Sequence, residues 1–380
     1  MTAAPRFLFA SDSLKGTLTS ADTARLLGEA AHRHFPSCAC ETVPMADGGE
    51  GTAAALVEAC GGELRRVRAS DPLGRPVEAA YALLPGGCAV VEMAAASGLP
   101  LLSPGEKNPL LTSTFGTGEL VRAALDAGSR DVTIALGGSA TNDGGLGLAR
   151  ALGVRLLDAG GRELAGRGED LARVATLDLS GLDPRVGEAS FHLMCDVDNP
   201  LTGPDGASVV FGPQKGATPE IVAALDAGMR SYARVLQVTF GRDFDAPGAG
   251  AAGGLAAGCM AFLGAQVESG VSRVLELTGF SARLARTDLC VTGEGHADAQ
   301  TARGKVVAGV AAACAAVGVP CVAVVGGMDV GATGLPGLDA VVPTAIDAMP
   351  LDEALERAAE LYALAADRLF SLLALGGRLG

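Results

Sequence analysis

The 380-residue chain has little of several residue types, and each shortage argues against a class of function. Tryptophan is absent and there are only three tyrosines, so the aromatic–basic patches of nucleic-acid-binding proteins are not evident. The 29 Lys and Arg residues are outnumbered by 43 Asp and Glu residues, which gives a formal net charge of −14. A strongly acidic protein does not attract nucleic acid or anionic lipid. We therefore expect a small-molecule substrate, no nucleic acid and no membrane.

Long hydrophobic segments are equally scarce. The first apolar stretch, Phe7–Ala10, is too short for the core of a signal peptide. The uncharged run Val306–Met328 is rich in Ala and Gly and is interrupted by Gly318 and Pro320. We interpret it as a helix, a turn and a buried strand rather than a membrane span. These features predict a cytoplasmic protein.

The nine cysteines are scattered and odd in number. Cys38 and Cys40 form a C-x-C pair, but the sequence has no C-x-x-C pair and no evident His/Cys cluster, and zinc sites use about four such ligands at matched spacings. We interpret the cysteines as small buried apolar side chains in a reducing compartment. His32 and His34, near the end of an expected helix, are interpreted as surface residues.

What the chain does contain is an alternation of short apolar runs with Ala- and Leu-rich helical stretches. This pattern is typical of an α/β protein, and the length favours two domains. The expected strands are Arg6–Ala10, Ala89–Met93, Val132–Leu136, Phe191–Cys195, Leu289–Thr292, Cys321–Val325 and Ala340–Val342. The expected helices are Ala21–Phe35 with Ser20 as N-cap, Gly118–Ala127, Gly144–Leu152, Pro219–Val235 with Thr218 as N-cap, Gly304–Val317 and Asp352–Leu373.

Two joints divide the chain, at residues 71–76 and 278–286. Both ends of the chain read as Rossmann-type βα units, whereas the middle is less regular. We therefore expect a discontinuous Rossmann-like parallel-sheet domain of residues 1–75 plus 287–380. A second α/β domain, residues 76–286, is expected to be inserted into it.

Polar, glycine-rich segments follow the expected strands. These are residues 11–16, 137–145, 195–200 and 292–305, and a fifth segment, residues 44–52, leads into a helix. Ligands of open α/β sheets bind beyond the carboxyl ends of the strands. The five segments therefore predict one polar, convergent site.

The residue types in these segments fit a phosphorylated ligand. Glycine lets main-chain N–H groups approach phosphate oxygens, and lysine supplies a point charge. The segments also carry the carboxylates Asp12, Asp47, Asp196, Asp198, Glu294 and Asp298. Magnesium binds one or two carboxylates together with substrate phosphates, and a further carboxylate can act as general base. This combination indicates phosphoryl transfer.

Each motif taken alone also fits a structural role. Gly-Gly pairs after strands are common turns, and Asp12 or Asp47 would equally suit a helix N-cap. The pattern Gly248-x-Gly250-x-x-Gly253 lacks a preceding strand, and Gly304-Lys305 lacks the rest of a nucleoside-triphosphate loop, so neither is interpreted as a dinucleotide or Walker motif. The hypothesis depends on the coincidence of several motifs.

Taken together, the motifs resemble those of the bacterial glycerate kinase family, in its glycerate 2-kinase branch. The strings are DSLKGTLT at 12–19, PMADGGEGT at 44–52, TSTFGTGEL at 112–120, LGGSATNDGGLG at 136–147, CDVDNPLTGPDGASVVFGPQKGA at 195–217, PGAGAAGGL at 247–255 and TGEGHADAQTARGK at 292–305. The resemblance implies transfer of the ATP γ-phosphoryl group to D-glycerate with Mg²⁺. It also implies an active site in the interdomain cleft of a Rossmann-like domain and an inserted α/β domain.

The resemblance assigns roles to residues that match its motifs. The catalytic residues are expected to be Asp196 as base, Lys15 and Asp12. The ATP- and phosphate-binding residues are expected to be Gly137, Gly138, Ser139, Thr141 and Asn142, in the segment that also holds Asp143, and Lys215, in the string at 195–217. The substrate-binding residues are expected to be Ser13, Asp47, Glu294, His296 and Lys305. The metal ligands are expected to be Asp198 and Asp298. Glu50 lies in the same family-like string as Asp47, at residues 44–52.

One departure from the family pattern is His296, which stands where the family commonly has arginine. Histidine carries only part of a positive charge near neutral pH, so it would replace an arginine that binds a carboxylate or phosphate only in part. Other readings are a glycerate 3-kinase, a kinase of a related hydroxy acid, a non-catalytic nucleotide or metabolite sensor, and a nicotinamide-dependent dehydrogenase. A monomer or a homodimer is expected.

Overall fold

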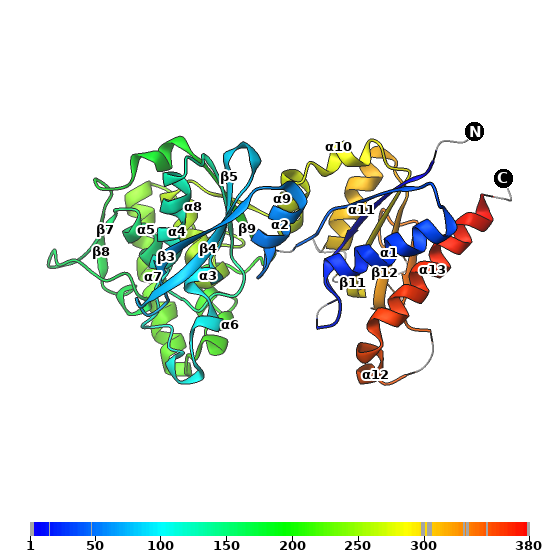
Figure 1. Cartoon of the computed structure of the whole chain (residues 1–380). Coiled ribbons are helices and arrows are strands. Elements are labelled where there is room, and N and C mark those ends of the chain that lie inside the picture. The colour runs from blue at the N-terminus through cyan, green and yellow to red at the C-terminus, as the bar shows by residue number, and fades with distance from the viewer. Residues whose placement is uncertain are drawn as a thin grey trace. The chain divides into compact units, whose positions relative to one another are not determined.

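The computed structural model describes residues 4–14, 16–46, 48–297, 301, 306–329, 331, 334–346 and 349–377. The chain divides into two compact units, and Figure 1 follows it through both. Unit 1 comprises Met1–Asp47 and Val271–Gly380, and unit 2 comprises Gly48–Gly270. This division differs from the expected domain limits over residues 48–75 and 271–286. The difference arises because β3 (Glu63–Ser70) pairs along its whole length with β4 (Pro76–Leu83), so both strands belong to unit 2.

The described residues of unit 1 form a parallel sheet in the order β13-β12-β11-β1-β2. The strands are β1 Arg6–Ser11, β2 Ala39–Thr42, β11 Leu289–Ala297, β12 Cys321–Met328 and β13 Ala340–Pro343, and the helices are α1 Ser20–His34, α9 Gly270–Leu277, α10 Phe280–Leu284, α11 Val306–Val317, α12 Leu351–Glu356 and α13 Ala358–Gly376. Val324 joins the core formed with α1 and α13, whereas Ala323 and Val325 pack with Val307 of α11. Helices therefore cover both faces of the sheet, because successive strand residues point to opposite faces.

The described residues of unit 2 form a mixed sheet in the order β10-β9-β6-β5-β4-β3. Its remaining strands are β5 Cys88–Glu92, β6 Asp131–Ala135, β9 Ser190–Met194 and β10 Gln266–Glu268, and β7 Arg155–Asp158 pairs with β8 Val174–Asp178 in a separate ribbon. The helices are α2 Thr52–Cys60, α3 Ala94–Ser97, α4 Phe115–Asp126, α5 Leu146–Ala151, α6 Ala207–Phe211, α7 Pro219–Phe240 and α8 Ala251–Phe262. Short 3₁₀ turns are η1 Pro85–Gly87, η2 Leu99–Leu101, η3 Pro104–Glu106, η4 Gly168–Asp170, η5 Pro184–Glu188 and η6 Pro213–Lys215. The strands β5, β6, β9 and β10 run parallel, and β4 and β3 continue the sheet antiparallel.

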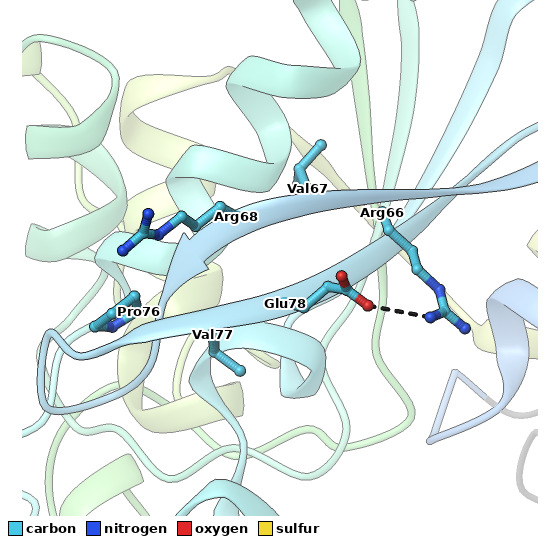
Figure 2. Close-up of a pocket in the computed structure, with 6 residues that line it drawn as sticks. All are labelled: Arg66, Val67, Arg68, Pro76, Val77 and Glu78. Carbon is cyan, nitrogen blue, oxygen red and sulfur yellow. Dashed lines mark hydrogen bonds and ion pairs between the residues drawn. The ribbon is translucent and has the colours of Figure 1, made fainter.

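The edge strand β3 is rich in arginine. Arg66 pairs with Glu78 of β4 at 3.1 Å, and Figure 2 shows both beside Arg68 at a surface pocket of about 320 Å³. Charged side chains on an edge strand hinder its pairing with another chain. None of the predicted site residues lines this pocket, so we interpret its charges as protection of the sheet edge.

The α/β class and the seven expected strands are confirmed, and several boundaries are corrected. Thr19, not Ser20, caps α1, because Thr19 and Asp22 form a reciprocal capping box. The helix expected at Gly144–Leu152 is only α5, because Gly144 and Gly145 adopt φ of +61° and +79°. The helix expected at Asp352–Leu373 is two helices, α12 and α13, separated at Arg357. Within the part of the chain that is described, no helix combines the length and apolarity needed to cross a bilayer.

Candidate functional site

Three of the predicted segments meet in unit 2 at the carboxyl ends of β5, β6 and β9, which are neighbours in the sheet. Gly137, directly beyond β6, donates its N–H to the carbonyl oxygen of Gly48 at 3.4 Å. A Cβ on Gly48 would lie 3.0 Å from the Cβ of Met194, the last residue of β9. Gly48 of the segment 44–52, Gly137 of the segment 137–145 and the end of β9 are therefore packed side by side.

Glu92, the last residue of β5, fixes the segment of residues 48–53 and was not predicted. Its carboxylate accepts hydrogen bonds from the main-chain N–H groups of Ala53 (2.7 Å) and Gly51 (3.3 Å) at the start of α2. Burial raises the pKa of Glu92, and these two hydrogen bonds oppose that shift. An acidic residue at the carboxyl end of an expected strand was the signal in the sequence that would have identified it.

The loop of residues 137–145 is supported from behind by the start of α8. Gly144 donates its N–H to the carbonyl oxygen of Gly253 at 3.0 Å. A Cβ on Gly253, which has φ +69°, would lie 2.0 Å from the carbonyl oxygen of Thr141. Only glycine allows this approach, so the string PGAGAAGGL has a packing role against the loop.

Asp143 anchors the end of the same loop and is fully buried. Its carboxylate accepts hydrogen bonds from the N–H of Thr114 (2.7 Å), Gly145 (3.2 Å) and Gly147 (3.1 Å) and from the hydroxyl of Thr114 (2.8 Å). Burial raises the pKa of Asp143, and the hydrogen bonds oppose the shift. The string TSTFGTGEL, which contains Thr114, therefore holds the loop through Asp143.

Lys215 lies beneath the loop and is 1% exposed. Its Nζ donates a hydrogen bond of 2.7 Å to the carbonyl oxygen of Thr141. Burial lowers the pKa of Lys215 to about 7, and the charge of Asp143 acts in the opposite direction. Asn142, also fully buried, donates from Nδ2 to the hydroxyl of Ser208 at 3.0 Å. These contacts join the long string at 195–217 to the loop.

The predicted phosphate-binding residues therefore fall into two groups that differ in burial. Gly138 is exposed, Gly137 is half-buried and Ser139 is 8% exposed. The side chains of Thr141, Asn142 and Lys215 are at or within 1% of complete burial. In this structure they lie beneath the loop. The side chains of Asn142 and Lys215 donate hydrogen bonds within the protein, and the hydroxyl of Thr141 is buried.

The carboxylates beyond β9 lie at the surface. Asp196 is exposed, and its Oδ1 accepts a hydrogen bond of 2.9 Å from the N–H of Gly270. Asp198 is also exposed and, among the described residues, receives no hydrogen bond. Exposed carboxylate oxygens are the donor type that Mg²⁺ uses, so Asp198 fits an oxygen-coordinated cation.

In unit 1 the predicted residues lie at the carboxyl ends of β1 and β11, which are adjacent. Asp12 donates its N–H to Gly293 at 2.9 Å, and its Oδ1 accepts the N–H of Ser13 at 2.7 Å. Glu294 is 7% exposed, whereas His296 is exposed and its Nε2 lies 3.2 Å from Oδ1 of Asp329. Lys15, Asp47, Asp298 and Lys305 lie outside the described residues.

These features define an α/β protein with glycine-rich and acidic loops at the carboxyl ends of parallel strands, a class that includes many kinases. The model of the glycerate kinase family matches residues 7–374. The chain belongs to the glycerate kinase family, and the family named from the motifs is confirmed.

Individual relatives agree with the family model. A glycerate kinase of Bacillus subtilis strain 168 is 44% identical over 359 residues, 93% of this chain and 94% of that protein. A glycerate 2-kinase of Escherichia coli K12 is 40% identical over 377 residues, 98% and 99% of the two chains. A crystal structure from Salmonella typhimurium LT2, of a protein assigned as glycerate kinase 2, is similar with a TM-score of 0.89 and 42% identity, covering 99% of this chain and 100% of that one. The chain is thus similar to kinases along nearly its whole length, and its α/β fold is that of a solved family member.

Proposed function

We propose that the protein transfers the γ-phosphoryl group of ATP to the 2-hydroxyl of D-glycerate, giving 2-phosphoglycerate and ADP. The observation that carries this proposal is the convergence of the family-like strings of unit 2 on the loop of residues 137–145, beside the carboxylate loop that holds Asp196. The glycerate 2-kinase of Escherichia coli, which is similar over 98% of this chain, supports the 2-hydroxyl as acceptor.

In this proposal the loop binds phosphate through its accessible main chain at Gly138, with Ser139 next to it, because the N–H of Gly137 is directed to the carbonyl oxygen of Gly48. Main-chain N–H groups act as donors of fixed direction, which need little reorganisation when the phosphate charge changes. Thr141, Asn142 and Lys215 are positioning residues, because their hydrogen bonds lie beneath the loop. The loop then presents its donors to the nucleotide without a charged side chain at its surface.

Asp196 is proposed as the general base. Its carboxylate accepts the proton of the glycerate 2-hydroxyl as the 2-oxygen forms its bond to the γ-phosphorus. The bond from the γ-phosphorus to the oxygen that bridges to the β-phosphorus breaks, and ADP leaves with that oxygen. The hydrogen bond from the N–H of Gly270 to Oδ1 of Asp196 restricts the orientation of the carboxylate.

Asp198, together with Asp298, is proposed to hold Mg²⁺. A bound magnesium ion neutralises charge on the phosphate oxygens. The exposed carboxylate of Asp198 suits this role, because no described residue competes for it by hydrogen bonding.

The substrate is proposed to be bound by the polar residues of unit 1, Asp12, Ser13, Glu294 and His296. Asp47, Lys15 and Lys305 are proposed for the same purpose from the motifs that contain them, Lys15 by offsetting negative charge. The location of the active site between the two domains stays a prediction, as does a monomeric or homodimeric state.

The test is identification of the product made from Mg-ATP and D-glycerate. Direct conversion of the product by enolase identifies 2-phosphoglycerate, and a requirement for phosphoglycerate mutase before enolase identifies 3-phosphoglycerate and contradicts the proposed acceptor. Ligand-dependent stabilisation without turnover would favour a sensor instead. Each assay uses the full chain.

His296 favours a second candidate, a kinase of a related small hydroxy acid. An arginine at this position would remain charged, whereas histidine near Asp329 changes the charge presented to a carboxylate. Rates with a panel of C3 to C6 hydroxy acids distinguish the two candidates, since the first requires D-glycerate to have the highest kcat/KM.

A further inference from the structure

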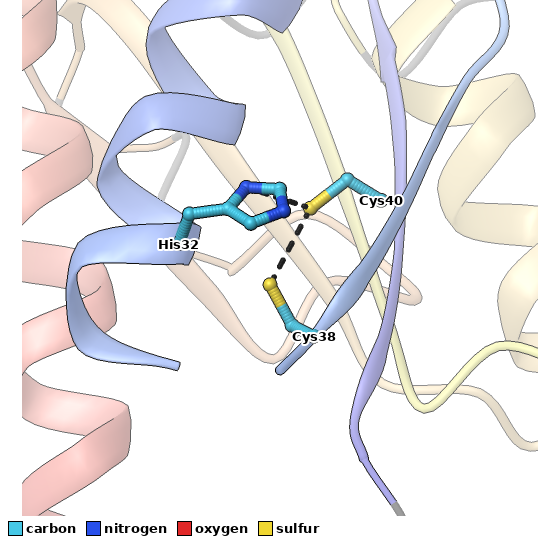
Figure 3. A group of neighbouring side chains, drawn as sticks. All are labelled: His32, Cys38 and Cys40. Atoms are coloured by element: carbon cyan, nitrogen blue, oxygen red, sulfur yellow. Dashed lines mark hydrogen bonds between the residues drawn. The ribbon is translucent and has the colours of Figure 1, made fainter. Parts of the chain in front are cut away.

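Three metal-ligating side chains meet at the edge of unit 1, in contrast to the absence of a His/Cys cluster inferred from the sequence. They are His32 in the last turn of α1, Cys38 just before β2 and Cys40 within β2. Figure 3 shows the imidazole and the two thiols pointing toward one another. None of them belongs to the segments of the proposed kinase site.

The local fold brings these residues together. The chain turns sharply after α1, where Cys38 donates its N–H to the carbonyl oxygen of Phe35 at 3.0 Å. Cys40 then pairs with Phe7 in the parallel ladder of β1 and β2. Cys38 and Cys40 are two positions apart in extended chain, so both side chains point to the face that carries α1.

The distances match those between ligands of one small ion. The two sulfurs lie 3.6 Å apart, and Sγ of Cys40 lies 3.9 Å from Nδ1 of His32. Zinc–sulfur bonds of about 2.3 Å and zinc–nitrogen bonds of about 2.0 Å in a tetrahedron place neighbouring ligands about 3.5 to 3.8 Å apart. The three ligand atoms all lie within 4.8 Å of one another, so an ion requires shifts of a few tenths of an ångström to about one ångström.

We propose that His32, Cys38 and Cys40 bind a thiophilic divalent cation, of which Zn²⁺ is the representative, with a fourth position open to solvent or another ligand. Cys38 is buried, Cys40 is half-buried and His32 is exposed, so an ion has access from the imidazole side. Cys40 also lines a surface pocket of about 370 Å³ with Arg6 and Arg286. The ion links the end of α1 to the edge strand β2.

One contact changes when the ion binds. Nδ1 of His32 lies 2.8 Å from the carbonyl oxygen of Gly28, and this nitrogen must carry the proton to donate there. Coordination through Nδ1 moves the proton to Nε2, which is the tautomer that a neutral imidazole ligand needs. The thiol protons of Cys38 and Cys40 leave to solvent, because thiolates are the ligands.

Three other thiols compete for the same kind of ion. Cys290, Cys314 and Cys321 are fully buried, and their sulfurs also lie within 4.8 Å of one another. We assign the ion to the first cluster because it alone of the two reaches solvent. The experiment is designed to separate them.

The test is titration of the reduced, metal-free full chain with Zn²⁺ against a chromophoric chelator, and with Co²⁺ to record thiolate-to-metal charge-transfer absorption. We expect one ion per chain. The affinity for the ion should fall at least about tenfold in Cys40→Ser, Cys38→Ser and His32→Gln, because even substitution of residues that only support metal ligands lowers metal affinity by about that factor. Cys60→Ser, which changes a half-buried cysteine in α2, is the matched control and should bind normally. Circular dichroism confirms that each variant is folded.

Two results would overturn the assignment. Binding that persists in Cys40→Ser but disappears in Cys314→Ala places the ion at the buried thiols. A wild-type chain that neither competes with a weak chelator nor develops thiolate charge-transfer absorption binds no such ion. Both readouts are independent of kinase turnover, so they stand whether or not the proposed phosphotransfer is correct.

Discussion

The side-chain nitrogen of Lys215 donates a 2.7 Å hydrogen bond to the main-chain carbonyl oxygen of Thr141, and both residues are closed to solvent. A lysine in a motif of a phosphate-binding protein is ordinarily expected at the surface, where its charge meets the ligand. Here the charge lies beneath the loop, so its contribution to binding is indirect. The pKa of Lys215, lowered to about 7 by burial, makes this placement measurable.

We predict that Lys215 makes the stability of the protein depend on pH above neutrality. Between about pH 7 and the ordinary lysine pKa of about 10.4, the unfolded chain binds one proton at this residue that the folded chain does not. Stability therefore rises with pH in this window, by at most about 1.4 kcal/mol per pH unit from this residue. The measurement is urea unfolding of wild type and Lys215→Met from pH 7 to 9. We expect the free energy of unfolding to rise with pH more in the wild type than in Lys215→Met, so that the difference between them grows in favour of the wild type.

The matched control is Lys107→Met, which removes a half-buried lysine. Its difference from wild type is measured over the same pH range, so that the growth expected for Lys215→Met is compared with the loss of a lysine that is not fully buried. Parallel pH profiles of wild type and Lys215→Met would contradict a lowered pKa. Burial of Lys215 would then contribute nothing to the change of stability with pH.

Gly253→Ala should distort the loop of residues 137–145. The new Cβ would lie 2.0 Å from the carbonyl oxygen of Thr141, so main chain must move on both sides. Gly241→Ala is the control, because Gly241 has a similar φ of +72° with nothing within 4 Å of a new Cβ. We expect the control to lose about 1 to 2 kcal/mol from the left-handed backbone alone. Gly253→Ala should lose more and show a raised KM for ATP, and equal losses in the two variants would argue against the close contact.

Asp143→Asn should destabilise unit 2 by about 3 kcal/mol. The carboxylate accepts four hydrogen bonds, and an amide both loses an acceptor and places N–H groups against the donors of Thr114 and Gly147. A double-mutant cycle with Thr114→Val measures the coupling by urea unfolding. Asp126→Asn, at an exposed ion pair with Arg185, should change stability by less than about 0.5 kcal/mol. Additive effects of Asp143→Asn and Thr114→Val would mean that the hydrogen bond from the Thr114 hydroxyl to Asp143 is not formed in solution.

Asp196→Asn should lower kcat by about 10² to 10⁴ with a modest change in KM, because it removes the proposed proton acceptor while keeping the side chain's shape. The amide oxygen can still accept the hydrogen bond from Gly270, so the loop should keep its conformation. Asp205→Asn changes another exposed carboxylate of the same segment and should leave kcat close to wild type. Near-normal turnover in Asp196→Asn would exclude it as the base and direct attention to Asp12 or Asp198.

Features that depend on a local sequence pattern, such as a buried strand or a helix N-cap, could be predicted from the sequence. Apolar runs located the buried strands, and the Thr218-Pro219 pair correctly marked the start of α7, where the Thr218 hydroxyl accepts from Ile221. The mostly exposed, arginine-rich strand β3 was missed because its sequence lacks a continuous apolar run, and its partner β4, in which Tyr81 and Ala82 are buried, was missed with it. The turn that joins them is stabilised by Asp71, whose Oδ1 accepts the N–H groups of Leu73 and Arg75.

Burial of polar groups was the part that the sequence did not predict. The motifs assigned Lys215 and Asn142 to phosphate binding, but not to a position beneath the loop. Asn142 reaches the hydroxyl of Ser208 in α6, a helix that was not expected. The same holds for His32 with Cys38 and Cys40, because a helix end and the next strand bring together residues whose spacing fits no metal motif. Spacing rules for zinc sites depend on ligand pairs such as C-x-x-C, and this cluster contains none.

The discontinuous course of unit 1 has a consequence for biosynthesis. The N–H of Arg6 at the start of β1 donates to the carboxylate of Asp288, 282 positions later, and β1 then pairs with β11. A ribosome makes β1 and β2 early, but the strand that completes their sheet emerges only after all of unit 2. The core of unit 2 can therefore form first, while β1 and β2 still lack β11, the strand that pairs with β1. Nascent chains would thus depend on a chaperone, or on rapid docking of β11, to shield the apolar residues of β1 until translation has passed residue 297.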